Sequence, residues 1–181
     1  VAPSTSFDAK GLLATAIDDP NPVLFFEHKA LYRSQKQNIP DELYSIEFGK
    51  GEIKRSGRDA TIVTYGLCVH WALELAEQLV KEGVEIEVID LRTLLPWDVD
   101  LVLASLEKTN RLLILHEANL TGGIGAEIAA TVAQQGFELL DAPIRRVASL
   151  DTPIPFSEQL EKQLYLPKSR LAEAVREVLS F

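Results

Sequence analysis

The chain has 181 residues, 46% of them hydrophobic and 25% charged, and a net charge of −9. This composition suits a soluble protein of one domain, or of one domain plus a piece of another. The acidic balance argues against a nucleic-acid partner, and no apolar run approaches the roughly 20 residues of a membrane helix. The single cysteine, Cys68, excludes an intrachain disulfide and suits a reducing compartment. Without a methionine or a signal-peptide pattern, the sequence is expected to be a fragment or a processed product.

Residues 1–35 are expected to be the tail of a larger domain. They contain a predicted helix, Ser6 to Ile17, and a predicted strand, Val23 to Glu27. One helix and one strand cannot bury a core alone, so the front of that domain should lie elsewhere. Residues 36–58 are polar, charged and punctuated by glycines, which predicts an exposed linker.

Residues 59–181 alternate regularly between strand and helix patterns. Short apolar runs predict strands, and apolar residues at three- and four-residue spacing predict amphipathic helices. This alternation predicts a three-layer α/β domain, with a mostly parallel sheet flanked by helices. The expected strands are Ala60–Tyr65, Val84–Ile89, Arg111–His116 and Ile144–Ala148, and the expected helices are Val69–Glu82, Pro96–Thr109, Ile124–Gln135 and one that begins at Ser169.

The loops after these strands are where such sheets bind ligands. Gly66 follows the first strand, and we interpret it as a residue that permits a tight turn into the next helix. Asp90 and Arg92 follow the second strand and are interpreted as a structural salt bridge. Trp97 in the same loop serves either an interface or the core, and both alternatives remain open.

The sequence Gly122-Gly-Ile-Gly125 invites comparison with a dinucleotide-binding loop. It lacks the third glycine of the full fingerprint, and Glu127 brings negative charge to the helix start, which disfavours a phosphate. We therefore interpret this turn as structural. His28, His70 and His116 have no metal-ligand spacing and are interpreted as hydrogen-bonded structural residues.

Six sequence motifs are distributed over the whole chain. They are Lys10-Gly-Leu-Leu13, Phe25-Phe-Glu-His-Lys-Ala-Leu-Tyr-Arg33, Ile89-Asp-Leu-Arg-Thr-Leu-Leu-Pro-Trp-Asp98, His116-Glu-Ala118, Leu120-Thr-Gly-Gly123 and Asp151-Thr-Pro153. Together they resemble the beta subunit of the thiamine-diphosphate-dependent 2-oxo acid dehydrogenases, in the family's motif order. The resemblance assigns residues 1–35 to the end of a pyrimidine-binding domain, residues 36–58 to a linker and residues 59–181 to a transketolase-like carboxyl-terminal domain.

This resemblance implies oxidative decarboxylation of a 2-oxo acid on thiamine diphosphate, with magnesium, followed by acyl transfer to a lipoyl group. The motifs at His116 and Leu120 are closest to the branched-chain enzymes, so 2-oxoisovalerate is the first expected substrate and pyruvate the second. The family's activating glutamate and catalytic histidine precede Val1, and its pyrophosphate–magnesium site belongs to the alpha part. No catalytic or cofactor-binding residue is therefore assigned, and this fragment alone is expected to be inactive and not to bind the cofactor. The expected location is the bacterial cytoplasm or the mitochondrial matrix.

One feature that the resemblance carries over is a structural loop for a monovalent cation. The matching positions are Ala16, through its carbonyl, Asp19 and Asn21, which are oxygen donors suited to potassium. An ordinary Asp-Pro-Asn-Pro turn is an equal alternative.

The carboxyl-terminal helix is the second such feature. Leu171, Ala174, Val175 and Val178 should lie on the sheet. Glu173, Glu177 and Phe181 are then left at the surface, where the resemblance implies contact with a basic domain of a dihydrolipoyl acyltransferase. A solvated helix end is the alternative.

Two classes of function remain open. In the first, the chain is part of an enzyme and builds the oligomer around the active site, with the alpha part and a second beta subunit as partners. In the second, it is a non-catalytic docking module that binds the acyltransferase core.

Overall fold

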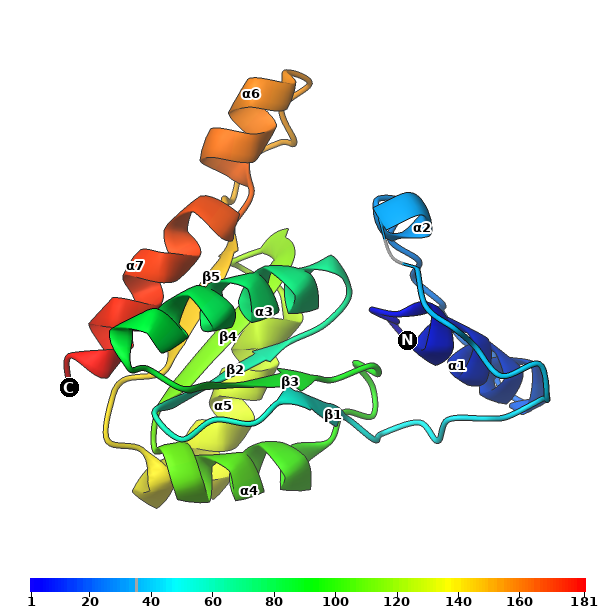
Figure 1. Ribbon diagram of the computed structural model, residues 1–181, viewed down its shortest axis with the longest axis horizontal. Helices are drawn as coiled ribbons and strands as arrows, with labels where there is room; N and C mark the ends of the chain where they lie inside the picture. Colours follow the sequence, from blue (N-terminus) through cyan, green and yellow to red (C-terminus); the bar gives the residue numbers. More distant parts are fainter. Residues whose placement is uncertain (35) are drawn as a thin grey trace.

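The body of the molecule is a five-stranded sheet between two layers of helices, in a computed structural model that describes residues 1–34 and 36–181 (Figure 1). The strand order is β1-β3-β2-β4-β5. Strands β2 to β5 are parallel, and β1 pairs antiparallel with β3. The predicted mostly parallel α/β fold is confirmed. The strands are β1 (Glu52–Arg55), β2 (Ala60–Thr64), β3 (Ile86–Asp90), β4 (Leu112–Asn119) and β5 (Arg145–Ser149).

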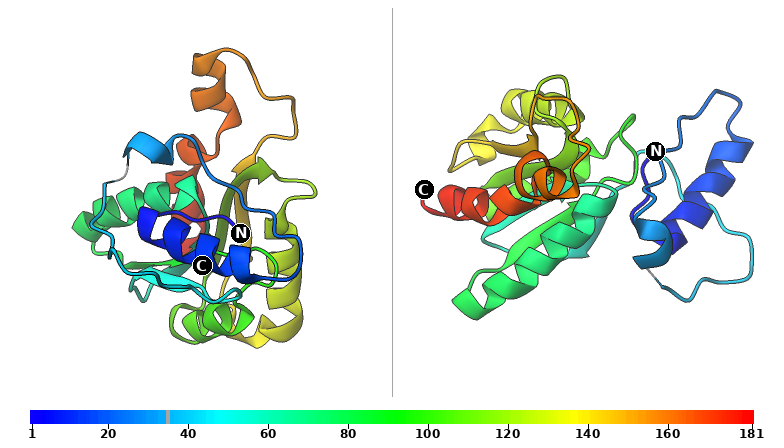
Figure 2. Two further views of the ribbon diagram at one scale, coloured as in Figure 1. Left: turned by 90° about the vertical axis from the view of Figure 1, so that its right-hand side faces the viewer. Right: turned by 90° about the horizontal axis from the view of Figure 1, so that it is seen from above.

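Helices cover both faces of this sheet. Helices α3 and α7 lie on one face, and α4 and α5 lie on the other (Figures 1 and 2). In α7 the predicted apolar stripe is confirmed, because Leu171, Val175 and Val178 are buried and Ala174 is half-buried. The helices of the sheet layers are α3 (Leu67–Leu79), α4 (Val99–Thr109), α5 (Ile124–Gln135) and α7 (Lys168–Leu179), and short 3-10 turns follow at Val80–Glu82 and Phe137–Leu139.

Two hydrophobic clusters form the core, one on each face of the sheet. Ile62 packs into the cluster under α3 and α7, and the next residue, Val63, packs into the cluster under α4 and α5. This alternation explains why residues 62–63 of β2 and residues 112–115 of β4 are uninterrupted apolar runs, since both faces of these strands are buried. Trp97 packs against the second cluster, which favours the core alternative for that residue. Every member of both clusters lies within residues 60–179.

The amino-terminal segment, residues 1–34, lies outside the sheet (Figures 1 and 2). It contains α1 (Ser6–Asp18) and the single turn α2 (Leu31–Ser34). The side chain of Thr5 begins α1 by accepting a hydrogen bond from the Asp8 amide at 3.1 Å. The predicted strand Val23–Glu27 is wrong. The backbone hydrogen bonds described for these residues join Leu24 and Phe26 to the single residue Val1, and a strand forms only where a neighbouring strand pairs with it.

Two elements were not expected from the sequence. Strand β1 lies in the range predicted as an exposed linker, and it is an edge strand of the sheet. Helix α6 (Glu158–Leu160) and the π-helical turn Glu161–Tyr165 form an arm that projects from the body (Figure 1). Among the described residues, no helix has the length and apolar character needed to cross a membrane.

Candidate functional site

The candidate site lies at the carboxyl ends of the central strands, where the amino-terminal segment meets the sheet. Helix α3, which follows β2, and helix α5, which follows β4, lie on opposite faces of the sheet although the two strands are neighbours. In open α/β sheets this arrangement opens a crevice between the two strand ends, and ligands bind there. Gly66 starts α3 with a φ of 58°, which confirms its predicted role in a tight turn.

Five charged side chains from three segments form a cluster beside this crevice. We call Asp8, Glu52, Lys54, Asp90 and Arg92 the charge cluster. Lys54 Nζ lies 3.0 Å from Asp8 Oδ2, and Arg92 Nη2 lies 2.7 Å from Asp8 Oδ1. Both cations also contact the carboxylate of Glu52. The side chains of Asp8 and Asp90 are fully buried, so these ion pairs are shielded from solvent.

The predicted salt bridge between Asp90 and Arg92 is wrong, because the Arg92 guanidinium pairs with other carboxylates. The backbone N–H of Arg92 donates to Asp90 Oδ1 at 3.0 Å, whereas its guanidinium pairs with Asp8 and Glu52. A φ of 58° at Arg92 turns the chain immediately after Asp90. The Ser4 hydroxyl donates to Asp90 Oδ2 at 2.5 Å instead. Burial raises the pKa of Asp90 to about 6, against the opposing effects of Ser4 and Lys54.

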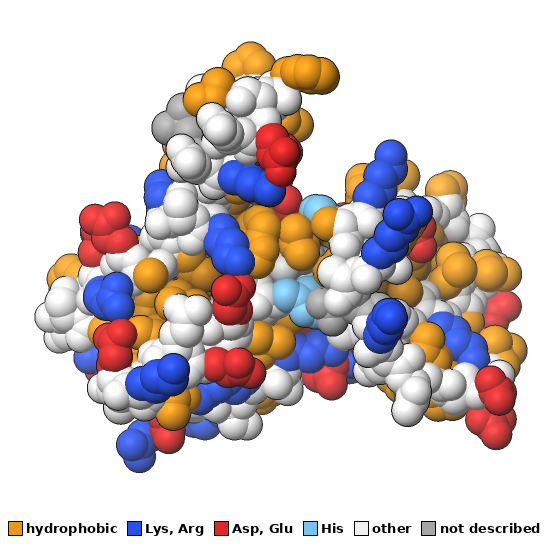
Figure 3. Space-filling model, turned by 45° about the horizontal axis from the view of Figure 1, so that its top comes forward, with side chains coloured by type: hydrophobic (Ala, Val, Ile, Leu, Met, Phe, Trp, Pro, Cys, Tyr) orange, Lys and Arg blue, Asp and Glu red, His pale blue; other side chains and the backbone are white. Residues whose placement is uncertain are grey.

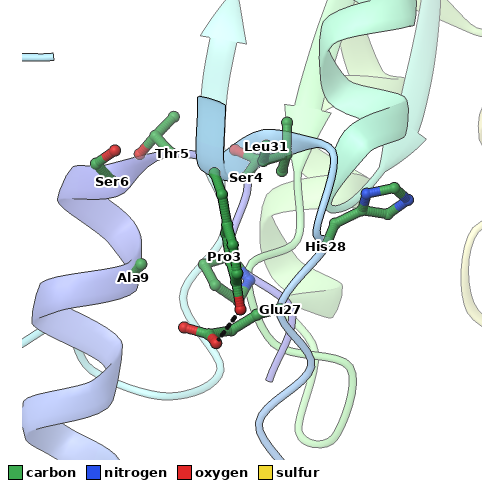
Figure 4. A pocket seen from close by; sticks show the side chains of 9 residues that line it. Pro3, Ser4, Thr5, Ser6, Ala9, Glu27, His28 and Leu31 are labelled. Carbon is green, nitrogen blue, oxygen red and sulfur yellow. Dashed lines mark hydrogen bonds between the residues drawn. The ribbon is translucent and has the colours of Figure 1, made fainter. Parts of the chain in front are cut away.

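A second polar contact lies on the other side of the crevice. His28 Nε2 lies 2.8 Å from Glu117 Oε2 of β4, and burial raises the pKa of Glu117 despite this partner. The ring of His28 points away from the neighbouring Glu27 carboxylate, which accepts a hydrogen bond from Tyr32 (Figure 4). A cavity of about 250 Å³ separates the segment from the sheet here, and it is lined by Ala2, Phe26, Glu27, His28, Tyr65, Gly66, Leu67 and Glu117.

The glycine-rich turn packs against His116. The ring Nδ1 of His116 donates to the Ala118 carbonyl at 3.0 Å, and burial lowers the pKa of the ring, which keeps it neutral. A methyl group on Gly123 or on Gly125 would lie 2.7 Å from a carbon of this ring, closer than such atoms approach. The glycines therefore permit close packing of α5 on β4, and the structural interpretation of this motif is favoured over a dinucleotide loop.

The other two histidines also have hydrogen-bonding partners. His70 Nε2 lies 2.8 Å from the Ser4 carbonyl, and His28 pairs with Glu117. In both contacts a residue of the amino-terminal segment meets an element of the sheet domain. Their predicted structural roles agree with this geometry.

The predicted cation loop has the geometry of a closed turn. Ala16 lies in the last turn of α1, and Asp19 follows the helix as its C-cap. Asp19 Oδ1 accepts from the backbone N–H of Asn21 at 2.8 Å and from its side-chain amide at 3.0 Å. Within residues 1–34 and 36–181, no three His, Cys, Asp or Glu side chains are grouped to hold a metal ion. The cation assignment stays a prediction.

Two of the predicted docking residues, Glu173 and Glu177, lie on the exposed side of α7, and Phe181 follows the end of this helix. Glu173, Glu177 and Phe181 are all exposed, and Glu177 Oε2 lies 3.1 Å from Arg145 Nη2 of β5. Glu173 and Glu177 border a groove of about 430 Å³ between α7 and β5, together with Arg145 and Arg146. This placement leaves them accessible to a partner, and their role in docking stays a prediction.

The site as a whole is a junction between two parts of the chain. Its acids already pair with cations or hydroxyl groups of the same molecule, as Asp8 does with Arg92. Sequence reasoning missed Asp8, Glu52 and Lys54. The one available signal was the alternation of Glu52 and Lys54 across Ile53, which is typical of a strand with one polar face.

Comparison with known proteins matches this chain to one domain family and to several curated enzyme subunits. A family model described as "Transketolase, C-terminal domain" matches residues 49–171. The beta subunit of the pyruvate dehydrogenase E1 component of Bacillus subtilis is 46% identical over 182 residues, covering 100% of this chain and 55% of that protein. The 2-oxoisovalerate dehydrogenase beta subunit of the same organism is 43% identical, with 100% and 56% covered.

Two further comparisons extend this result. The beta subunit of acetoin:2,6-dichlorophenolindophenol oxidoreductase of Bacillus subtilis is 52% identical over 167 residues, covering 92% of this chain and 48% of that protein. A solved structure titled "Split gene transketolase, inactive beta4 tetramer" superposes with a TM-score of 0.79 at 26% identity, covering 98% of this chain and 56% of that one. The chain spans about half the length of the curated relatives that it matches. The resemblance to beta subunits of 2-oxo acid dehydrogenases is confirmed, and the chain belongs to the family of the transketolase carboxyl-terminal domain.

Proposed function

We propose that the complete protein is the beta part of a thiamine-diphosphate-dependent 2-oxo acid dehydrogenase, of which this chain is the carboxyl-terminal part. The observation that carries the proposal is the match to the pyruvate dehydrogenase beta subunit over 100% of the chain. That match includes residues 1–48, which lie outside the family model. The likeness therefore extends beyond the carboxyl-terminal domain into a further part of the same enzyme subunit, and it favours an enzyme part over a separate docking module.

The described residues do not fit a site for thiamine diphosphate and magnesium. A magnesium–pyrophosphate site needs carboxylate oxygens free to bind the cation, and these residues contain no suitable metal-binding group. The buried carboxylates of the charge cluster already contact Lys54 and Arg92. We therefore place the cofactor, and the decarboxylation that it supports, in the alpha part and in the rest of the beta part.

The role of this region in the proposal is assembly. The amino-terminal segment exposes large apolar side chains, including Ile17 and Leu24, each 74% exposed. Figure 3 shows hydrophobic side chains at the surface of this part of the molecule, and exposed apolar surface is typical of a face that another part of a protein covers. This supports residues 1–35 as the tail of a pyrimidine-binding domain, residues 36–58 as a linker and residues 59–181 as the carboxyl-terminal domain. The alpha part and a second beta subunit complete the proposed enzyme.

Two features of the surface belong to the same proposal. The exposed residues Glu173, Glu177 and Phe181 face a basic domain of a dihydrolipoyl acyltransferase, where carboxylates speed the encounter of oppositely charged partners. The turn at Ala16, Asp19 and Asn21 binds potassium once the missing part of the beta subunit supplies further oxygen ligands. Proteins of this class act in the bacterial cytoplasm or the mitochondrial matrix, and we place the complete enzyme there.

The similarity to these relatives supports 2-oxo acids as the substrate class but does not select one 2-oxo acid. Identities of 46% and 43% do not put 2-oxoisovalerate ahead of pyruvate. Acetoin cleavage is a second candidate function, because two acetoin oxidoreductase beta subunits are 52% and 49% identical to this chain.

The test is a substrate comparison with the full-length beta part and its alpha partner purified together. Reduction of an artificial electron acceptor is measured with pyruvate, 2-oxoisovalerate or acetoin, with and without thiamine diphosphate. The proposal expects cofactor-dependent turnover that is highest with one of the two 2-oxo acids. Highest turnover with acetoin would establish the second candidate, and no cofactor-dependent turnover with any of the three would contradict both.

A further inference from the structure

The amino-terminal segment is attached to the sheet by polar contacts. Both hydrophobic clusters lie within residues 60–179, so the apolar core does not hold the segment. The polar attachments include the charge cluster, the Ser4–Asp90 hydrogen bond, the contact of His70 with the Ser4 carbonyl, the bond from the Ala2 N–H to the Arg92 carbonyl at 2.8 Å, and the His28–Glu117 pair. The strength of such a polar junction depends on the charges of its side chains more than the strength of an apolar interface does.

Four members of the charge cluster form a closed ring of alternating charge. Lys54 contacts Asp8 and Glu52, and Arg92 contacts the same two carboxylates. Each cation therefore has two acidic neighbours, and each acid has two basic ones. Asp90 is the fifth member, with its Oδ2 3.9 Å from Lys54 Nζ. The cluster thus holds three carboxylates and two cations, and Asp90 is the surplus charge.

We propose that the charge cluster is a latch that holds the amino-terminal segment against the sheet near the carboxyl end of β3. We further propose that protonation of Asp90 strengthens this attachment. With Asp90 neutral, the two remaining carboxylates balance Lys54 and Arg92. The bond to Ser4 survives the change, because a protonated carboxyl can donate to the Ser4 hydroxyl that it accepted from before. Repulsion between Asp90 and the nearby Asp8 carboxylate also disappears.

The groups that face Asp90 come from every element packed around it. Asp8 and Ser4 belong to the amino-terminal segment, Lys54 and Glu52 to β1, and Arg92 to the following loop. Helix α3 contributes His70, which reaches the latch through the Ser4 carbonyl at 2.8 Å. Within residues 1–34 and 36–181, the charged side chains that act on the Asp90 carboxyl are Lys54, which attracts it, and Asp8, which repels it.

The direction of the pH effect follows from the pKa of Asp90. Burial raises this pKa from 3.8 to about 6 in the closed latch, whereas an open latch returns Asp90 to water. A group whose pKa is raised in the closed state favours closure below that pKa and loses the effect as the pH rises through it. Opening should therefore fall about tenfold between pH 7 and pH 5.

Hydrogen exchange of the Ala2 amide in the full-length protein tests the latch, after correction for the intrinsic pH dependence of exchange, because this N–H bonds to the Arg92 carbonyl across the junction. Asp90→Asn imitates the protonated state, since its amide can donate to Ser4. At pH 7 this variant should exchange as slowly as the unmodified protein does at pH 5, with the pH dependence lost. Asp8→Asn should speed exchange at least about tenfold at both pH values, because it removes the ion pairs of the amino-terminal segment with Lys54 and Arg92, whereas Glu52 and Asp90 belong to the sheet domain. Glu107→Gln removes an exposed acid of α4 and should change nothing.

The two aspartates thus have opposite predicted effects, which a general loss of packing cannot produce. Faster exchange in Asp90→Asn at pH 7, or a retained tenfold pH effect in that variant, would overturn the proposal. Failure of Asp90→Asn to fold would also overturn it, since the latch requires that a neutral residue be tolerated there. Unchanged exchange in Asp8→Asn would show that the ring does not hold the segment. None of these outcomes depends on the substrate of the enzyme.

Discussion

His28 Nε2 lies 2.8 Å from Glu117 Oε2, so a residue of the amino-terminal segment is joined directly to β4. The contact lies across the crevice from the charge cluster. The amino-terminal segment is therefore anchored at two separate points. With two anchors, the segment cannot rotate freely about either one.

Glu117→Gln should loosen the stretch around His28 with little change in global stability. About a third of each side chain is exposed, 33% for His28 and 29% for Glu117. Pairs with that exposure contribute at most about 1 kcal/mol to the free energy of unfolding. Hydrogen exchange should become faster in residues 23–34 while the denaturant midpoint barely moves. Glu158→Gln, which removes a pair with Lys162 on the projecting arm, is the control. Equal exchange in both variants would mean that the His28 contact anchors nothing.

Gly125→Ala should destabilise the domain through a clash with His116. A methyl group there would lie 2.7 Å from His116 Cδ2, and overpacking of this kind costs about 1–3 kcal/mol. In a His116→Ala background the same change should become neutral or stabilising, since alanine favours a helix over glycine. Urea unfolding of the two single variants and the double variant gives the coupling energy. An additive double variant would show that the glycine is present for another reason.

Cys68 should resist thiol reagents in the folded protein. It is 1% exposed, and burial raises the pKa of its thiol, which suppresses the reactive thiolate. Labelling with a chromogenic disulfide reagent should therefore proceed only as fast as the protein opens, and unfolding in denaturant should expose one thiol per chain at once. Rapid stoichiometric labelling of the native protein would be incompatible with this burial.

Deletion of Ser180 and Phe181 should weaken docking to the acyltransferase if the carboxyl-terminal end is part of that interface. Phe181 is 61% exposed, and its removal also shifts the terminal carboxylate. The association rate in surface plasmon resonance should fall at low salt and converge with that of the unmodified enzyme at high salt, because salt screens surface charges. Glu107→Gln, which changes an exposed acid of α4, serves as the control. Identical association rates at both salt concentrations would remove this end from the interface.

The fold of residues 59–181 could be predicted because its signals are local. Strand β4 begins with four apolar residues, 112–115, and is buried on both faces there, so its apolar run is visible without a known partner. Strand β1 was not predicted, because Glu52 and Lys54 give this segment the composition of a linker. Only its pairing with β3 makes it a strand. The sequence Val23–Glu27 failed in the opposite way, since aromatic and branched residues favour a strand but no strand lies beside it.

The candidate site was less predictable for a related reason. Arg92 pairs with Asp8, which lies far away in sequence, and the nearer Asp90 receives only its backbone N–H. Sequence spacing reports neighbours along a strand or helix, whereas this junction brings together three separate segments. The glycine turn was different, because its departure from the nucleotide fingerprint was visible locally and the packing against His116 agrees with the structural interpretation.

The most direct test of the proposed division of labour is calorimetric titration of thiamine diphosphate, with magnesium, into two samples. One sample is the isolated 181-residue chain, and the other is the complete enzyme with its alpha part. We predict tight binding by the complete enzyme and no measurable heat from the isolated chain, since its described residues offer no site for the metal. Micromolar binding to the isolated chain would show that this region holds the cofactor by itself, and a complete enzyme that does not bind the cofactor would show that the proposed function is wrong.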